Sequence, residues 1–563
     1  MRERTVLIAG AGLWLVLMFA FGLPHAIWRH FHVDEIQVAY NIAQWGVLDQ
    51  SAAHTNYAAP FMVPLSWLIG GLDTGSSMLL VMRLCFFLLF GACLVGLAIS
   101  QPYFKSRPGK LMVLFGVSMF HPFWLHGFEI RHDSIIVAGS IALYGVAQYV
   151  ASRERSPAWV FVLAGAVAGI MQTNGFKAFL YWLPFCGLIV VIATVKLRKQ
   201  DKSIDIKPAL FVLAGIAGAV AVAMLLLLVS GRLDVYLSGM RGALDTSETA
   251  YKFSASEGLK GLILSSPLVF AGAGLFIGVV AVDCVRKRLR IDLRAAVTAA
   301  FLLWNLVVLA INPVPFSYNF IHIIPFAFVA ALDVLSRIKL ANDESTRLGV
   351  AAVLVACLLL FAQNWRFHPY SKQTNDKQLA YIAAAEALTS KNDTVLDGVG
   401  LVVSRRAPDK HWMLHSLHMP AYKAGKRTSF HQMITTKPSP VAIASYRWGW
   451  LSKQDRQTIA SRYIQLYPKF FVLGTRLTSS EGELPIFYAG RYLVRTRTPV
   501  PQLSLLIDGR PLPPSRVVDL SAGRHSFSNA QAGNTIVHWI GPNLDAPPKL
   551  DALGPKQRLF TTD

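Results

Sequence analysis

The chain has 563 residues, of which 53% are hydrophobic and only 15% are charged, and its mean hydropathy is +0.43. A soluble protein of this length carries about 25% charged residues, so this composition excludes an ordinary soluble globular protein. The formal net charge is +22. We therefore expect a multi-pass membrane protein with a basic surface, with the membrane as a partner and no nucleic-acid partner.

Apolar stretches long enough to cross a bilayer recur through the first two thirds of the chain. We predict about eleven spans. We interpret the first as a retained helix, because no small-x-small cleavage site follows it. The predicted spans are 5–23, 78–99, 111–126, 134–151, 157–172, 178–196, 208–230, 259–282, 295–311, 319–336 and 347–364.

Clusters of Lys and Arg give the orientation of these spans, because cytoplasmic loops carry an excess of both residues. The clusters occupy alternate loops and are Arg2/Arg4, Lys105/Arg107/Lys110, Arg153/Arg155, 196–207, 286–294 and Arg337/Lys339/Arg347. An odd number of spans then places the chain after residue 365 on the opposite face. This pattern predicts an inner-membrane protein whose C-terminal domain is periplasmic.

The loops on that opposite face are poor in clustered cations and contain polar side chains that need an explanation. They include "HFHVDEIQVAYN", "HGFEIRHDS", "QTNGFK" and "INPVPFSYN". Carboxylates so close to apolar segments are costly unless a site requires them. Acids, bases and the C-terminal tail are thus expected to meet on one side of the membrane.

The loop between the first two spans is too long for a simple turn. Ile36, Tyr40, Ala43 and Val47 recur at helical spacing, which predicts an amphipathic helix lying in the membrane interface. The apolar piece 61–72 is too short to cross and is expected to lie at the surface or to re-enter the membrane.

The tail has a different composition. From Arg366 onward it holds 26 Lys and Arg against 13 Asp and Glu. "YIAAAEALTSKNDTVLDGVG" predicts a helix, a turn and a buried strand, and "PKFFVLGTRL" predicts another strand. Asp508-Gly509 and Ala522-Gly523 mark β-turns between alternating apolar and polar residues. We predict a mixed α/β domain over 366–499 and a small β-rich unit over 500–563.

These features together resemble the GT-C superfamily of membrane glycosyltransferases, and most closely the protein O-mannosyltransferase and aminoarabinose transferase branch, glycosyltransferase family 39. The resemblance covers residues 1–365 and implies a transmembrane catalytic domain there. It also implies a polyprenyl-phosphate-linked sugar as donor and catalysis on the periplasmic face. The basic tail is consistent with an anionic acceptor of the cell envelope, such as lipopolysaccharide or another lipid or glycan, and a protein acceptor stays open.

Three segments carry the resemblance. "HVDEIQVAYNIAQWG" is similar to the Asp-Glu-x-x-Tyr-like opening of the family, which implies that Asp34 is the catalytic carboxylate. "EIRHDS" is similar to the Arg-Pro-Asp element, with Arg131 and Asp133 as counterparts, although His132 replaces the proline. "TNGFKAFLYWLP" resembles the Lys-Gly-Pro stretch in a different order, with Lys177 as the candidate phosphate partner.

The chemistry of such a transfer needs a base for the acceptor, cations for the leaving phosphate and an apolar groove for the isoprenoid chain. A single displacement would invert the anomeric centre. The predicted catalytic residues are Asp34, Glu35 and Asp133. The predicted substrate-binding residues are Arg131, Lys177, Glu129, His32, Tyr40, Tyr318 and His322.

Each assignment has an alternative. Asp34 and Glu35 also suit the first turn of a helix as capping residues. Arg131 and Asp133 also suit a structural ion pair, and Lys177 suits a side chain that reaches the headgroups. No cofactor follows from the residues, and a divalent metal ion stays open. The alternative function is a multi-span transporter or lipid flippase.

Overall fold

The computed structural model describes residues 2–47, 59–100, 111, 113–115, 126–201, 205–246, 259–260, 263–264, 267–286, 292–311, 317–337, 374–409, 414–415, 419–497, 504–550 and 559–560. Its contacts divide the chain into two units. The membrane unit comprises Met1–Arg29, Ala53–Val63 and Met82–Pro369. The tail unit comprises His30–Ala52, Pro64–Val81 and Tyr370–Asp563.

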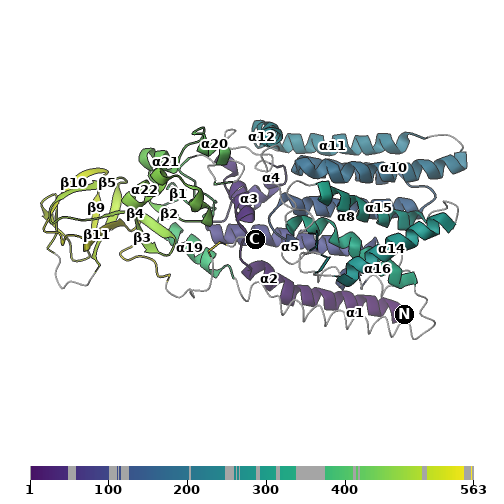
Figure 1. The fold of residues 1–563 in the computed structure, drawn as a ribbon, viewed down its shortest axis with the longest axis horizontal. Coiled ribbons are helices and arrows are strands. Elements are labelled where there is room, and N and C mark those ends of the chain that lie inside the picture. Colours follow the sequence, from purple (N-terminus) through teal and green to yellow (C-terminus); the bar gives the residue numbers. More distant parts are fainter. Residues whose placement is uncertain are drawn as a thin grey trace. The chain divides into compact units, whose positions relative to one another are not determined.

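The membrane unit consists of long apolar helices that lie alongside one another (Figure 1). Seven helices of the described chain are long and apolar enough to cross a membrane. One span, Ile8–Trp28, comprises most of α1 (Arg2–Leu17), a π-turn (Met18–Gly22) and α2 (Leu23–Trp28). Another, Phe176–Arg198, comprises a 3₁₀ turn (Phe176–Ala178) and most of α10 (Phe179–Asp201). The others are α5 (Gly75–Ile99, whose first residues belong to the tail unit), α8 (His132–Ser152), α11 (Lys207–Val229), α14 (Pro267–Arg286) and α15 (Leu293–Ile311). Shorter helices are α9 (Ala158–Asn174), α12 (Leu233–Thr246) and α16 (Ile324–Arg337), and a 3₁₀ turn, Ser317–His322, precedes α16.

These helices confirm the predicted polytopic helical fold. The predicted spans 111–126 and 347–364 lie largely or wholly outside the described residues, and the other predicted spans coincide with the helices above. The apolar piece 61–72 forms the eight-residue helix α4 (Met62–Ile69), which is too short to cross a bilayer.

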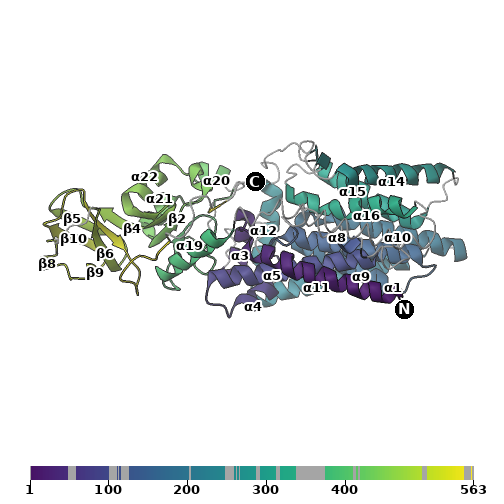
Figure 2. The same cartoon turned by 90° about the horizontal axis from the view of Figure 1, so that it is seen from below.

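Small residues hold α9 and α11 together in the membrane unit, and Figure 2 shows the two helices side by side. Gly165 and Gly169 form a Gly-x-x-x-Gly pair on α9. A Cβ added at Gly165 would lie 1.9 Å from the Val212 carbonyl oxygen, and one at Gly215 would lie 2.1 Å from the Val162 carbonyl oxygen. The two backbones therefore approach as only glycine permits, which is how helices gain contact in lipid.

The core of the tail unit is a seven-stranded sheet with strand order β1-β2-β4-β11-β6-β9, in which β3 also pairs with β4. Its strands are β1 (Val395–Leu396), β2 (Val441–Ile443), β3 (Tyr463–Tyr467), β4 (Phe470–Arg476), β6 (Gly490–Thr496), β9 (Val517–Leu520) and β11 (Thr535–Trp539). The described helices of this unit include α3 (Val33–Ala43), α19 (Asp376–Ala387), α20 (Met419–Lys423), α21 (Phe430–Thr436) and α22 (Lys453–Arg462). The helices and strands of this unit confirm the mixed α/β character predicted for the C-terminal part of the chain, whereas the predicted bounds 366–499 stay a prediction.

A second sheet has strand order β5-β10-β7-β8. Its strands are β5 (Gly482–Ile486), β7 (Leu506–Ile507), β8 (Arg510–Pro511) and β10 (Gly523–Ser528). Asp508 and Gly509 join β7 to β8 with positive φ angles of 52° and 74°, the two-residue turn that the Asp-Gly pair predicts. Because β10 pairs with β5 and β11 lies between β4 and β6, strands from both sides of residue 500 share both sheets.

The predicted interfacial helix is present as α3, but its surroundings differ from the expectation. Nearly all of its residues are buried, on every side of the helix, and it ends at Ala43 before a separate 3₁₀ turn, Trp45–Val47. The reason is tertiary: the Ala407 amide donates to the Tyr40 hydroxyl (2.8 Å), and Gln44 Nε2 donates to the Val403 carbonyl (2.7 Å). Helix α3 is thus packed within the tail unit rather than lying on a lipid surface.

Replacing Gly215 by Val tests the α9–α11 contact. We expect the midpoint of thermal unfolding in detergent to fall by an amount equivalent to about 1–3 kcal/mol, because the new side chain meets the α9 backbone. Gly218→Val on the same helix is the matched control, since a Cβ there meets nothing within 4 Å. Equal losses from the two variants would show that backbone approach at Gly215 is unimportant.

Candidate functional site

The start of α8 holds a buried carboxylate surrounded by basic groups, called here the Asp133 cluster. Asp133 is 1% exposed, and Lys177 Nζ lies 2.5 Å from its Oδ1. Arg131 Nε lies 3.5 Å from Oδ2, and the Nε2 atoms of His132 and His322 lie 3.6 Å and 3.9 Å from the carboxylate. The sequence-predicted residues Arg131, Asp133, Lys177 and His322 therefore come together in one place.

Local structure explains how these side chains meet. Asp133 lies in the first turn of α8, where the helix dipole favours a negative charge. Gly175 ends α9 in an extended conformation, and a Cβ there would lie 2.9 Å from Ile136 Cδ1. The absence of a side chain lets this turn pack against α8 and brings Lys177 to the carboxylate. Lys177 Nζ also donates to Asn319 Oδ1 (3.2 Å).

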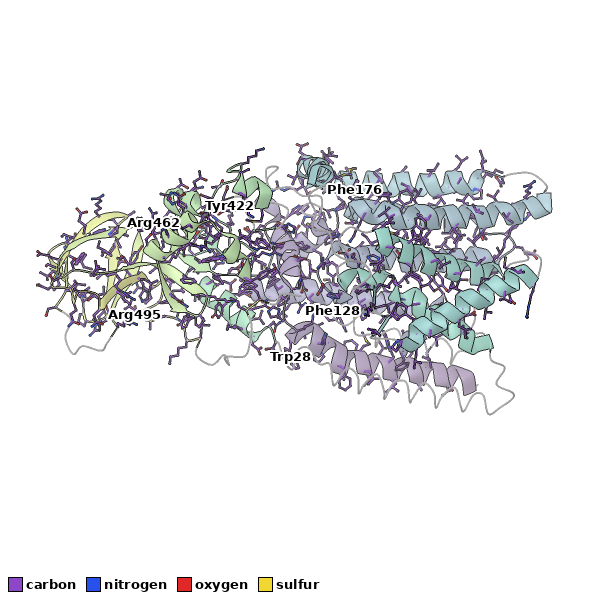
Figure 3. The ribbon with its side chains drawn as sticks, viewed as in Figure 1. Trp28, Phe128, Phe176, Tyr422, Arg462 and Arg495 are labelled. Carbon is purple, nitrogen blue, oxygen red and sulfur yellow. The ribbon has the colours of Figure 1, made fainter. Side chains whose placement is uncertain are left out.

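A second buried carboxylate, Glu129, adjoins the cluster and is 1% exposed. Both terminal nitrogens of Arg29 donate to its Oε1 at 3.3 Å, and His126 Nδ1 lies 3.1 Å from the same oxygen. Arg131 Nη1 lies 3.8 Å from Oε2, so Glu129 is placed to orient the Arg131 guanidinium. The Arg29 guanidinium also lies over the Phe128 ring, 5.1 Å from its centroid; Figure 3 labels Phe128.

Among the residues that the structure describes, this region holds more cations than carboxylates. Three cations, Arg29, Arg131 and Lys177, stand against the two carboxylates, with histidines beside them. The side chains of both arginines and both carboxylates are at most 7% exposed, whereas Lys177 is 29% exposed. Cations held in place in this way, one of them partly exposed, are suited to bind an anion.

Two arginines of this region, Arg83 and Arg29, were not predicted from the sequence. Arg83 is fully buried in α5 and donates to the carbonyl oxygens of Ala26 and Arg29, at 3.3 Å and 2.6 Å. It thereby fixes the end of α2 from which Arg29 reaches Glu129. A signal was present, because an arginine inside an apolar span is by default a candidate for function.

The tail unit contains the second group of predicted residues, centred on Asp34. Its side chain is 32% exposed and lies 3.3 Å from Arg447 Nη2. Arg447 is 7% exposed, and its guanidinium lies 5.5 Å from the ring centroids of both Tyr446 and Trp450. Its Nη1 donates to the Leu414 carbonyl (2.8 Å). Arg447, which the sequence did not single out, is thus held rigidly against Asp34.

Glu35 and His32 have a different place from Asp34. They form a capping box at the start of α3, in which Glu35 Oε2 accepts from the His32 amide (3.3 Å) and His32 Nδ1 accepts from the Asp34 amide (3.3 Å). Glu35 is fully buried. The capping alternative therefore describes Glu35 and His32, whereas the Asp34 carboxylate faces Arg447.

Tyr40 packs against a glycine loop of the tail unit. A Cβ added at Gly400, whose φ is +77°, would lie 2.6 Å from Tyr40 Cγ. The Asp397 carboxylate organises this loop by accepting hydrogen bonds from the backbone amides of residues 399–402. Burial raises the pKa of the Tyr40 hydroxyl, which stays protonated. Of Tyr318, the structure describes the backbone, in the 3₁₀ turn before α16.

The two groups belong to different units: the Asp133 cluster to the membrane unit, Asp34 to the tail unit. Their predicted meeting at one site stays a prediction. Among the described residues, no group of three or more His, Cys, Asp or Glu side chains is placed to hold a metal ion.

Comparison with known proteins identifies the fold. No family model matches the chain, and no curated protein sequence matches it. The structure is similar to ArnT from Cupriavidus metallidurans bound to undecaprenyl phosphate, with a TM-score of 0.55 and 13% identity over 83% of this chain and 97% of that chain. Apo ArnT gives a TM-score of 0.52 and 15% identity over 82% and 98%. An oligosaccharyltransferase from Archaeoglobus fulgidus gives 0.47 and 11% over 88% and 73%. The predicted GT-C-like fold is confirmed by the likeness to ArnT.

A double-mutant cycle tests the buried Asp133–Lys177 pair. We expect Asp133→Asn to lower the free energy of unfolding by about 3 kcal/mol, because it leaves buried cations unneutralised. Combining it with Lys177→Met restores part of the charge balance. The double variant is therefore expected to lose about 1 kcal/mol less unfolding free energy than the sum of the two single losses. Thermal or denaturant unfolding in detergent provides the measurement. Strict additivity would contradict a direct interaction.

Proposed function

We propose that this chain is an inverting glycosyltransferase of the inner membrane that moves a sugar from a polyprenyl-phosphate donor to a cell-envelope acceptor on the periplasmic face. The observation that carries the proposal is the Asp133 cluster, a buried, cation-rich group at the end of an apolar helix bundle. ArnT, whose fold this chain shares, was solved with a polyprenyl phosphate, which supports a lipid phosphate as the ligand.

Arg131 and Lys177 are the residues that bind the phosphate of the donor. Lys177 is the more exposed of the two, and Asp133 holds its ammonium group in place at 2.5 Å. Arg131 is fixed between Glu129 and Asp133. Cations positioned before the reaction stabilise the negative charge that develops on the leaving phosphate without a cost of reorganisation. Asp133 is therefore a positioning residue in this proposal.

Asp34 is the base. It follows Arg29 by five residues, so the extended chain alone limits the separation of their Cα atoms to about 18 Å. The contact with Arg447 keeps the Asp34 side chain in one orientation while leaving it 32% exposed. An exposed carboxylate of fixed orientation is suited to accept a proton from a substrate hydroxyl.

The bond changes follow from these roles. The acceptor oxygen attacks the anomeric carbon while its proton passes to Asp34. The bond from that carbon to the phosphate oxygen breaks, and the lipid phosphate leaves with the electron pair beside Arg131 and Lys177. One displacement inverts the anomeric centre. The apolar bundle holds the isoprenoid chain. After residue 365 the chain has 26 basic residues against 13 acidic residues, which favours an anionic envelope glycan as acceptor.

The direct test is transfer of radiolabelled sugar from synthetic undecaprenyl-phosphate-linked donors to envelope lipids and glycans by the purified chain in liposomes. Label in the acceptor fraction, with the inverted anomeric configuration, is the expected result. Solute counterflow or lipid scrambling in the same liposomes, with no transfer across a panel of such donors, would favour a transporter or flippase instead. Mass spectrometry of envelope glycolipids and glycoproteins from a strain lacking the chain identifies the acceptor.

Asp34→Asn tests the base. We expect transfer to fall by about 10²–10⁴-fold, because the amide cannot accept the proton. The variant should insert and stay monodisperse, since asparagine keeps the size of the side chain and its Oδ1 can still accept from Arg447 Nη2. Asp73→Asn is the matched control, because Asp73 is 82% exposed in the same unit and pairs only at the surface with Lys391. Near-normal turnover by Asp34→Asn would remove this residue from the mechanism.

Arg131→Ala and Lys177→Ala test the phosphate contacts. Each is expected to lower kcat/KM for the lipid donor by about 10²–10³-fold while leaving KM for the acceptor nearly unchanged. Lys391→Ala, which removes a 75% exposed cation, serves as the control. Normal donor kinetics in both variants would overturn the phosphate assignment.

A further inference from the structure

The membrane unit contains a cavity of about 240 Å³ at the opposite ends of its helices from the Asp133 cluster. Helices α8, α9, α10 and α11 each contribute to it. Its charged lining residues are Arg153, Glu154, Arg155, Lys196, Asp205 and Lys207, and its apolar lining includes Phe161, Leu197 and Phe211. Phe161 and Phe211 lie about one turn inside α9 and α11, further along the helices than the charged residues at their ends, and these apolar lining residues are called here the apolar floor.

Position along α8 places the cavity at headgroup depth. Asp133 lies in the first turn of α8, and Arg153 follows its last residue, so the helix of 21 residues separates them by about 30 Å. That length is the thickness of the hydrocarbon core of a bilayer. Tyr149 and Trp159, whose rings lie 6.4 Å apart, flank the cavity region, and such aromatic residues mark membrane interfaces.

The electrostatics of the cavity favour an anion. Among the lining residues that the structure describes, four are cations and two are carboxylates. Lys196 Nζ donates to the carbonyl oxygens of Val150 (2.9 Å), Ala151 (2.7 Å) and Arg153 (2.7 Å), so it neutralises the negative end of α8. Asp205 Oδ1 accepts from the Lys207 amide (2.9 Å), which directs this acid to the start of α11.

The start of α9 adds to the positive potential. Its N-cap is Pro157, which provides no side-chain hydrogen bond to the first turn, and Ala158 of this turn lines the cavity. The first amides of a helix carry partial positive charge and attract phosphate groups. The cations of the lining and this helix end thus act in the same direction.

We infer that this cavity binds the phosphodiester headgroup of an anionic phospholipid, whose acyl chains follow the apolar floor. Arg153 and Lys207 hold the phosphate, while Lys196 prevents the end of α8 from repelling it. Basic pockets between transmembrane helices are recognised sites for such lipids. The inference is independent of the proposed transfer reaction, because it concerns the other ends of the helices and requires no sugar.

The test uses the full chain in detergent and native mass spectrometry with phosphatidylglycerol and phosphatidylcholine. We expect the wild-type chain to retain phosphatidylglycerol at least ten times more tightly than phosphatidylcholine. The variant Arg153→Gln/Lys207→Gln should lose that preference. Arg286→Gln is the matched control, because Arg286 is an exposed basic residue at the end of α14 that does not line the cavity. Should the double variant be poorly folded, Lys207→Gln alone is expected to weaken retention about threefold or more.

Competition separates a lipid from a soluble anion. Inorganic phosphate at millimolar concentration is expected to leave retention of phosphatidylglycerol unchanged, because it gains nothing from the apolar floor. Displacement of the lipid by phosphate, equal retention of the two lipids, or an unaltered preference in the cavity variants would each overturn the inference.

Discussion

Buried carboxylates at the ends of apolar helices are the constraint on which the structure of the membrane unit depends. Asp133 and Glu129 are each 1% exposed, and an unpaired charge at such a position would cost several kcal/mol. Each therefore recruits cations from distant parts of the chain, Lys177 to Asp133 and Arg29 to Glu129. These pairs fix the first helix, the start of α8 and the turn before α10 with respect to one another.

The same pairing gives the region its chemical character. Among the described residues, three cations gather around the two buried carboxylates, and one of them, Lys177, is 29% exposed. In the proposed function, a lipid-linked phosphate matches both these cations and the apolar helices around them. In the tail unit, an ion pair has a comparable effect: the buried Arg447 orients the carboxylate of Asp34, which stays partly exposed.

Some residues show why the site was only partly predictable. Arg131, Asp133 and Lys177 were found because charged residues beside apolar runs are rare and their cost demands a reason. Arg83 carried the same signal inside an apolar span. Arg447 gave none, since it is one of many basic residues in the tail, and only packing against Tyr446 and Trp450 makes it special. The capping role of Glu35 and the burial of α3 also depend on contacts far along the chain.

The sequence by itself determined the membrane class, the position of most spans, the mixed α/β tail and the residues that gather around Asp133. It could do so because hydropathy, turn residues and misplaced charges are local properties. Only the tertiary structure decided that α3 is part of the tail unit, that strands on both sides of residue 500 share two sheets, and that Asp34 faces Arg447. Those outcomes depend on pairings between residues that lie tens to hundreds of positions apart, whose energies no local pattern records.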